Sequence, residues 1–321
     1  MAAGPDRRGW VFEGTDAAPR CHASTIVEAV PGVFLAAWFA GSGEGADDSA
    51  NWMARFEDGA WSEPRVFANV EGHAHGNPRL FRLGTGDLAI IYAVNYGAWC
   101  RGGSRNFIRT SADVGRSWSC PREIVTDPPF LGKNKALLLA DPPESLLPVT
   151  IEGDPYAAAV LLGTPEGDYW VVTQVLHGSD DTAILQPTLA RLSDGSVLML
   201  LRTTGGRLWR CRSADRGRTW SPPEPTDLPN NYSGIDLAPL PDGSLLLALN
   251  PVADRKKRTP LVLMRSADDG ETWRTVATLE DGDGEFSYPA LITASDGSVH
   301  CTYTHRRTRI AHAAFAPGAF A

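Results

Sequence analysis

Pairs of short apolar runs recur along the whole chain, and a polar turn joins the two runs of each pair. The pairs lie at residues 24–39, 78–93, 135–151, 187–202, 235–250 and 289–304. Three of the six turns contain Asp-Gly and Gly-Ser, steps that favour β-hairpins, while the third pair is irregular around Pro143 and Glu144. Each pair therefore predicts two adjacent antiparallel strands, and no segment has the period of a long helix.

A second pattern, Ser-Ala-Asp-x-Gly-x-(Ser/Thr)-Trp, falls between the later strands of these units. Full copies lie at 111–118, 213–220 and 266–273, and degenerate copies at 56–64 and 164–170. The Asp can accept hydrogen bonds from turn amides, the Gly can adopt a positive φ, and the Trp can bury its ring. Each copy lacks the further carboxylates of a calcium site. We therefore interpret the turns as structural.

The two patterns repeat about every 50 residues, which is the period of a propeller blade of four strands. We predict an all-β fold, a six-bladed β-propeller in a single domain over residues 1–321. The segment "GWVFEG" at 9–14 supplies the missing fourth strand of the last blade, so that the two termini close the ring. The approximate blades are 15–68, 69–126, 127–178, 179–228, 229–281 and 282–321.

Composition narrows the function classes. The net charge of −8 argues against nucleic-acid binding, and no apolar run is long enough to span a bilayer. The first residues lack a signal-peptide core, and the five cysteines form no CxxC pair, so we expect a cytoplasmic protein with free thiols. His73-x-His75 alone is too little for a metal site, and we expect neither metal nor cofactor. The oligomeric state stays open.

The three full turns at blade period resemble the Asp-box, or BNR, repeats of the sialidase superfamily. Stretches such as "CHASTIVEAVPG" and "GEFSYPALITASDG" are similar to its bacterial branch of predicted neuraminidases, and the resemblance covers essentially the whole chain. The Asp-box by itself marks only a fold. The resemblance implies a glycoside hydrolase with three arginines that clamp a carboxylate, a Tyr–Glu nucleophile pair and an Asp acid/base.

Positions near the start of each inner strand carry the candidate site, counted back from the turn glycine of each hairpin. Nine residues before it lie Asn77, Gln186, Gly234 and Tyr288. The resemblance assigns the nucleophile to Tyr288. It assigns the second and third clamp arginines to Arg202 and Arg258.

Two positions depart from the family pattern. The first clamp arginine is replaced by His22, ten before Gly32. The glutamate partner of the tyrosine is expected near Gln186, which cannot accept a proton as a base; Glu285 could substitute, out of register. For the acid/base, the loop "GSGEGADD" (41–48) offers Asp47, Asp48 and also Glu44.

Other polar residues are predicted at the blade mouths. His22 and His75 suit acid or base work near neutral pH, and each also fits a structural histidine. Candidates for hydrogen bonds to sugar hydroxyls or an anionic group are Asn77, Gln186, Lys133, Asn134, Ser233 and Asp236, the last of which also fits a turn cap.

Three hypotheses remain open, all with a carbohydrate partner that is anionic. The first is a sialidase-like exo-glycoside hydrolase that acts on a terminal acidic sugar. The second is a polysaccharide lyase that performs β-elimination on a uronic-acid glycan, with His22 or His75 as base and Tyr288 as acid. The third is a glycan-binding propeller without catalysis.

Overall fold

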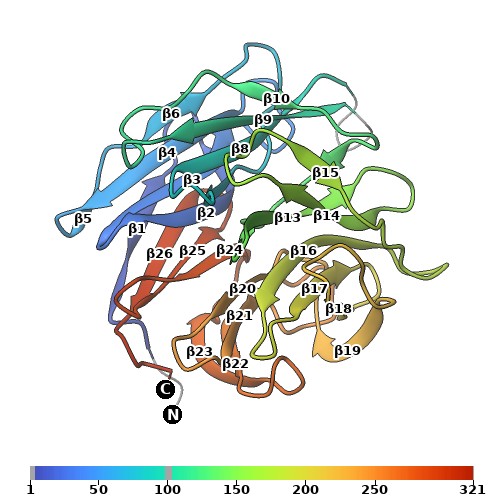
Figure 1. The fold of residues 1–321 in the computed structure, drawn as a ribbon. Coiled ribbons are helices and arrows are strands. Elements are labelled where there is room, and N and C mark those ends of the chain that lie inside the picture. Colours follow the sequence, from blue (N-terminus) through green and yellow to red (C-terminus); the bar gives the residue numbers. More distant parts are fainter. Residues whose placement is uncertain (1–3, 98–102, 321) are drawn as a thin grey trace.

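The computed structural model describes residues 4–97 and 103–320. Among these residues the strands form six separate antiparallel sheets around a common centre, and no helix occurs (Figure 1). The predicted six-bladed β-propeller is therefore confirmed. The described part of the chain accordingly contains no helix that is long and apolar enough to cross a bilayer.

The strands of the first three blades are β2 (Arg20–Val30), β3 (Val33–Gly41), β4 (Ala50–Glu57), β5 (Ala60–Trp61) and β6 (Arg65–Ala68); β7 (Arg79–Arg82), β8 (Leu88–Asn95), β9 (Ser104–Ser111) and β10 (Arg122–Ile124); and β11 (Phe130–Leu131), β12 (Leu137–Ala140), β13 (Pro143–Ile151), β14 (Ala157–Gly163) and β15 (Trp170–Val172). Those of the last three are β16 (Ile184–Arg191), β17 (Val197–Thr203), β18 (Arg207–Ser213) and β19 (Glu224–Pro229); β20 (Asp236–Pro239), β21 (Leu245–Leu249), β22 (Leu261–Ser266) and β23 (Arg274–Glu280); and β24 (Phe286–Thr293), β25 (Val299–His305), β26 (Arg309–Phe315) and β1 (Arg7–Glu13).

The N-terminal strand closes the ring, as predicted. β1 pairs antiparallel with β26, from Arg7 opposite Ala314 to Glu13 opposite Arg309. The first and last segments of the chain thus lie in one sheet (Figure 1). Neighbouring blades also touch through their inner strands, because β2 packs against β24 and β7, and β20 against β16 and β24.

Blade three departs from the regular pattern at its inner edge. Two short strands, β11 and β12, both pair with β13. Between them, residues 132–136 extend toward the neighbouring inner strands, where Lys133 bonds the carbonyls of Ile235 and Pro289.

The Asp-box turns join the third and fourth strands of their blades and are structural, as interpreted. In the blade-four copy, Asp215 accepts hydrogen bonds from Thr219 N at 2.8 Å and Thr219 Oγ1 at 2.6 Å. These bonds lower the pKa of Asp215 to about 2. Gly217 has a φ of 83°, and its carbonyl accepts a bond from Trp220 Nε1 at 3.1 Å. The turn therefore fixes the Trp ring against the blade.

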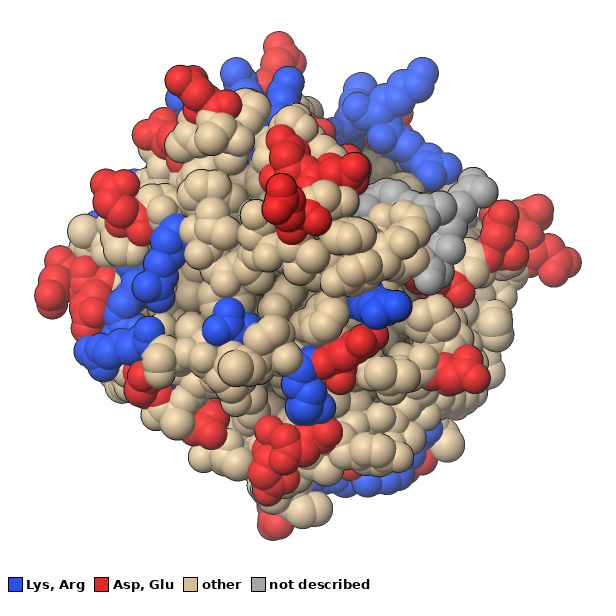
Figure 2. Space-filling view, turned by 90° about the horizontal axis from the view of Figure 1, so that it is seen from above, with Lys and Arg blue, Asp and Glu red and all other residues tan. Residues whose placement is uncertain are grey.

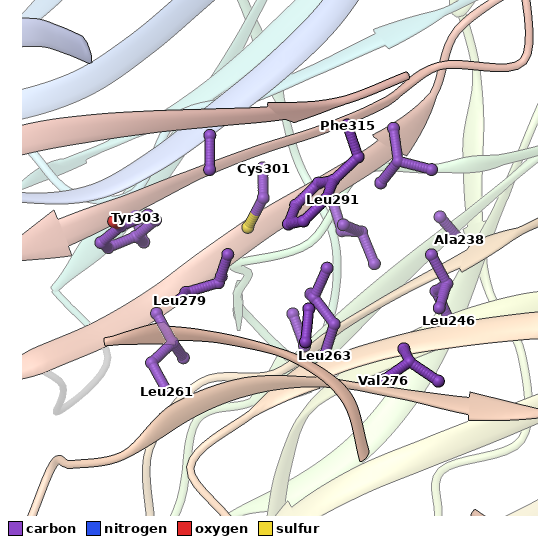
Figure 3. Packing of buried hydrophobic residues seen from close by; sticks show 14 of the residues in the cluster. Ala238, Leu246, Leu261, Leu263, Val276, Leu279, Leu291, Cys301, Tyr303 and Phe315 are labelled. Carbon is purple, nitrogen blue, oxygen red and sulfur yellow. The ribbon is translucent and has the colours of Figure 1, made fainter. Parts of the chain in front are cut away.

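The core lies mainly between adjacent blades. Figure 3 shows the packing between blades five and six, where Leu246, Leu263 and Leu291 meet Tyr303 and Phe315. On the outer face seen in Figure 2, acidic and basic side chains are intermingled. The propeller is thus held by apolar side chains inside and carries charges of both signs on that face.

Candidate active site

Three inner strands carry the same backbone irregularity near their start. The pairing register shifts between His22 and Thr25, between Leu185 and Thr188, and between Ser287 and Ala290. Within these bulges Ala23, Gln186 and Tyr288 have φ values of 55°, 45° and 53°. All three lie nine residues before their turn glycine. Left-handed backbone at a non-glycine residue costs about 1–3 kcal/mol and concentrates at functional sites, and a bulge re-aims the side chain.

A cavity of about 170 Å³ lies at this end of the propeller. Its wall includes the predicted residues Asn77 of blade two, Gln186 and Arg202 of blade four, and Tyr288 of blade six. It also includes Glu44 and Tyr232. The structure therefore brings together four of the side chains that the register and the resemblance had selected.

Arg202 and Tyr288 form the hydrogen-bonded centre of this cavity. Arg202 Nη1 donates to Tyr288 Oη at 2.6 Å and to Gln186 Oε1 at 2.5 Å. The guanidinium also stacks on the ring of Tyr232, with Cζ 4.1 Å from the ring centre. A guanidinium in this position can stabilise negative charge that develops on the oxygen to which it donates.

A chain of ion pairs runs along one side of the site. Glu285 Oε1 lies 2.7 Å from Arg258 Nη1 and 2.6 Å from Arg307 Nε. Burial opposes ionisation of Glu285, but the two arginines outweigh it and hold its pKa below the ordinary value. Arg307 Nη1 continues the chain to Glu44 Oε2 at 2.6 Å. Glu285 thus neutralises two arginines, and no hydrogen bond joins it to Tyr288 among the described residues.

Arg258 approaches the Tyr288 ring from the same side as this chain. Its Cζ lies 5.7 Å from the ring centre, and that of Arg202 lies 5.5 Å from it. Two of the three arginines that the resemblance implies are therefore next to the phenol. Arg307, which no sequence pattern indicated, is bonded to the same Glu285 as Arg258.

His22 lies against Tyr288 in a buried position. The two ring centres are 4.1 Å apart, and His22 Nδ1 is 2.9 Å from Thr304 Oγ1. Its Nε2 has no hydrogen-bond partner among the described residues. Burial, followed by the charges of Arg307, Arg258 and Arg202, holds the pKa of His22 well below its ordinary value, so the imidazole is neutral at physiological pH.

His75 has a different environment, although the sequence presented it as equivalent to His22. Its Nε2 accepts a hydrogen bond from Val70 N at 3.0 Å, and its Nδ1 donates to Asn51 Oδ1 at 2.8 Å. Burial lowers its pKa to about 4. Both ring nitrogens are occupied, and the residue ties the start of blade two to β4.

The acidic loop at 41–48 presents a different carboxylate from the two that the sequence favoured. Asp48 accepts hydrogen bonds from Ser42 N at 3.1 Å and Ser42 Oγ at 2.9 Å, which is a local turn cap. Asp47 is exposed, and neither residue lies in the cavity wall. Glu44 of the same loop does line the cavity.

The remaining candidates lie where inner strands meet. Lys133 Nζ donates to the carbonyls of Ile235 and Pro289, and burial lowers its pKa to about 8. Asn134 Nδ2 donates to Pro187 O at 2.8 Å, and Ser233 is fully buried. None of these three residues lines the cavity, and Lys133 and Asn134 join neighbouring blades instead.

Asp236 is the most highly bonded of these residues. Its carboxylate accepts hydrogen bonds from Lys135 Nζ and Leu291 N, both at 2.8 Å, from Thr188 Oγ1 at 2.9 Å and from Leu237 N at 3.0 Å. It therefore ties together blades three, four, five and six. No cluster of three or more metal-ligating side chains occurs in the described part of the chain.

The chain matches the family described as "BNR repeat-like domain" over residues 32–301. It is also similar in structure to the Hadza microbial sialidase Hz136, with a TM-score of 0.82 and 18% identity over 96% of this chain and 68% of that one. For a protein of unknown function from Dyadobacter fermentans the TM-score is 0.81 and the identity 16%, over 97% and 98% of the two chains. For Trypanosoma rangeli sialidase the values are 0.75 and 15%, over 98% and 58%. No curated protein sequence matches the chain significantly.

Proposed function

Because the chain belongs to the BNR repeat-like domain family, within the sialidase superfamily, we propose that it is a glycoside hydrolase that removes an acidic sugar from the end of a glycan. The observation that carries this proposal is the position of Tyr288 in the cavity wall, with two arginines next to it. Arg202 donates a hydrogen bond to its oxygen, and Arg258 lies over its ring. An oxygen nucleophile next to two cations suits a substrate whose reacting carbon lies beside a carboxylate.

In this mechanism the substrate carboxylate binds Arg202 and Arg258, and the anomeric carbon lies beside Tyr288 Oη. The Tyr288 oxygen attacks that carbon and the glycosidic C–O bond breaks. The phenolic proton passes through water to the Glu44 carboxylate, which delivers it to the leaving oxygen. Water then cleaves the tyrosyl–sugar bond, with Glu44 as the base, and the phenol takes up a proton again.

Two features of the site support the choice of residues. Glu44 is the carboxylate of the 41–48 loop that lines the cavity, so it takes the role for which the sequence offered Asp47 and Asp48. Lys133 and Asp236 bind the inner strands of neighbouring blades together. A propeller centre joined by such contacts favours attack on a terminal sugar rather than within a chain.

The test is product release from a panel of acidic glycosides by the wild type and by Tyr288→Phe. The substitution keeps the ring but removes the oxygen, and we expect turnover to fall about 10²–10⁴-fold. Tyr169→Phe is the matched control, because Tyr169 is 66% exposed in the outer part of blade three, and its turnover should equal that of the wild type. Unchanged turnover in Tyr288→Phe would exclude the proposed nucleophile.

A lyase is a second candidate, and the environment of His22 favours it. A neutral imidazole with an unpartnered Nε2 beside Tyr288 is suited to removing the proton next to a uronic-acid carboxylate. β-Elimination leaves an unsaturated sugar that absorbs in the near ultraviolet. Appearance of that absorbance with uronic-acid glycans would support the lyase, and release of a saturated reducing sugar would support the hydrolase.

A further inference from the structure

A second cleft adjoins the cavity, and Glu44 belongs to the walls of both. The cleft has a volume of about 280 Å³, and its wall includes Arg20, His22, Ser42 and Arg307. Tyr288, Arg202 and Gln186 line only the first cavity, whereas Arg20 and His22 line only the second. The Glu44–Arg307 ion pair stands at the boundary between them.

We propose that the second cleft binds the sugar on the leaving-group side of the scissile bond, and that this sugar also carries an anionic group. The proposal rests on the proposed function, because it takes Glu44 as the group that protonates the leaving oxygen. A bond cleaved beside Glu44 has the terminal acidic sugar in the first cavity and its neighbour in the second. The substrate class is then a glycan with negative charges on two consecutive sugars.

The charges of the second cleft support an anionic neighbour. Arg20 stands at the start of β2, is exposed, and forms no ion pair or side-chain hydrogen bond with any described residue. Arg307 is the other cation of the cleft, and it is already shared between Glu44 and Glu285. A planar guanidinium without a partner matches a carboxylate or sulfate in a bidentate manner, so Arg20 is the side chain that selects the second charge.

His22 provides a second, independent feature of this cleft. The residue is 1% exposed, and its Nε2 lacks a hydrogen-bond partner among the described residues. A buried polar atom without a partner costs about 1–3 kcal/mol. A sugar hydroxyl bound in the cleft would satisfy it, so the cleft offers both a cation for an acidic group and a hydrogen-bonding atom for the ring that carries it.

The experiment compares a hexuronic-acid disaccharide with the same disaccharide esterified on the carboxylate of its second sugar. Binding to the wild type and to Arg20→Gln is measured by calorimetry, or kcat/KM is measured if the pair is turned over. Loss of one charge-assisted contact at a partly exposed site is worth about tenfold. We expect Arg20→Gln to weaken the diacid about tenfold and to leave the ester unchanged.

Arg191→Gln is the matched control. Arg191 is an exposed arginine at the opposite end of an inner strand, as the last residue of β16, and its substitution should alter neither probe. Equal effects of Arg20→Gln on both probes, equal binding of the two probes by the wild type, or no binding of either would overturn the second subsite.

The two proposals fail in distinguishable ways. If the diacid is bound in the expected pattern but no acidic glycoside is hydrolysed, the reaction is wrong and the charge selection by Arg20 stands. If hydrolysis depends on Tyr288 and Arg20→Gln affects both probes alike, the reaction stands and the subsite is wrong.

Discussion

Replacement of Asp236 by alanine tests whether this residue holds the blades together. Its side chain is 2% exposed and accepts hydrogen bonds from four donors. In the variant, Leu237 N keeps its bond to Thr188 Oγ1 at 3.1 Å, and Lys135 keeps its bond to Leu237 O at 2.8 Å. The Thr188 hydroxyl and Leu291 N lose the acceptor. Two buried donors at about 1–3 kcal/mol each, together with the lost ion pair, predict a destabilisation of about 3–5 kcal/mol.

The assay is guanidinium unfolding at neutral pH, with the m-value as a check that the native state stays compact. Asp236→Asn keeps the volume and one acceptor oxygen, so it should lie between the wild type and Asp236→Ala. Asp47→Ala removes an exposed loop carboxylate and should change the free energy of unfolding by no more than about 0.5 kcal/mol. A change in the free energy of unfolding below about 1 kcal/mol in Asp236→Ala, accompanied by loss of glycan binding, would refute the structural role. It would indicate that Asp236 binds the glycan instead.

Two further predictions concern stability. Trp61 Nε1 donates to His312 Nδ1, so His312 Nε2 carries the proton and donates to His300 Nδ1 at 3.0 Å. Burial lowers the pKa of His312 to about 3 and that of His300 to about 4. Below about pH 6.5 the unfolded chain binds more protons than the folded protein. The free energy of unfolding should therefore fall as the pH drops from about 6.5 to 4, and His300→Gln should make this decline shallower. A wild-type curve that stays level over this range would disprove the account. Trp220→Ala removes a ring that is 6% exposed and should lower the free energy of chemical unfolding by about 3–5 kcal/mol. Trp10→Ala, at a residue that is 40% exposed, should lower it by about 1 kcal/mol or less. Equal losses of stability in the two variants would contradict the role assigned to the Asp-box turns.

The fold could be predicted from the sequence because its signals are local and repeated. The Asp-box turn at 213–220 is built from residues only a few positions apart. Ser213 Oγ donates a hydrogen bond to Asp215 and accepts one from Gly217 N, and Trp220 Nε1 donates to Gly217 O. The same period brought Gln186 and Tyr288 into register, and both have left-handed backbone in the structure.

The site could be predicted only in part because its contacts join residues far apart in the chain. Glu44 and Arg307 lie 263 positions apart and meet only after the ring closes. Arg307 stands in a hairpin turn with a φ of 59°, where the sequence shows only another polar turn. Tyr232 lies two residues before Gly234 and therefore eleven residues before the turn glycine Gly243. Extending the count from nine to eleven residues would have found it.

The choice among equivalent polar residues also depended on tertiary contacts. In the 41–48 loop, Asp48 caps the turn while Glu44 reaches Arg307. His75 has both ring nitrogens bonded, whereas His22 has one. Nothing within the loop or strand sequences distinguishes these pairs, because the distinguishing partners come from other strands and blades.

The most direct test of the central claim is a crystal structure of the protein with an acidic monosaccharide bound. The account predicts that the sugar carboxylate lies within hydrogen-bond distance of Arg202 and Arg258, with the anomeric carbon beside Tyr288 Oη. A sugar bound in the cavity with its carboxylate away from both arginines, or bound only elsewhere on the propeller, would contradict it.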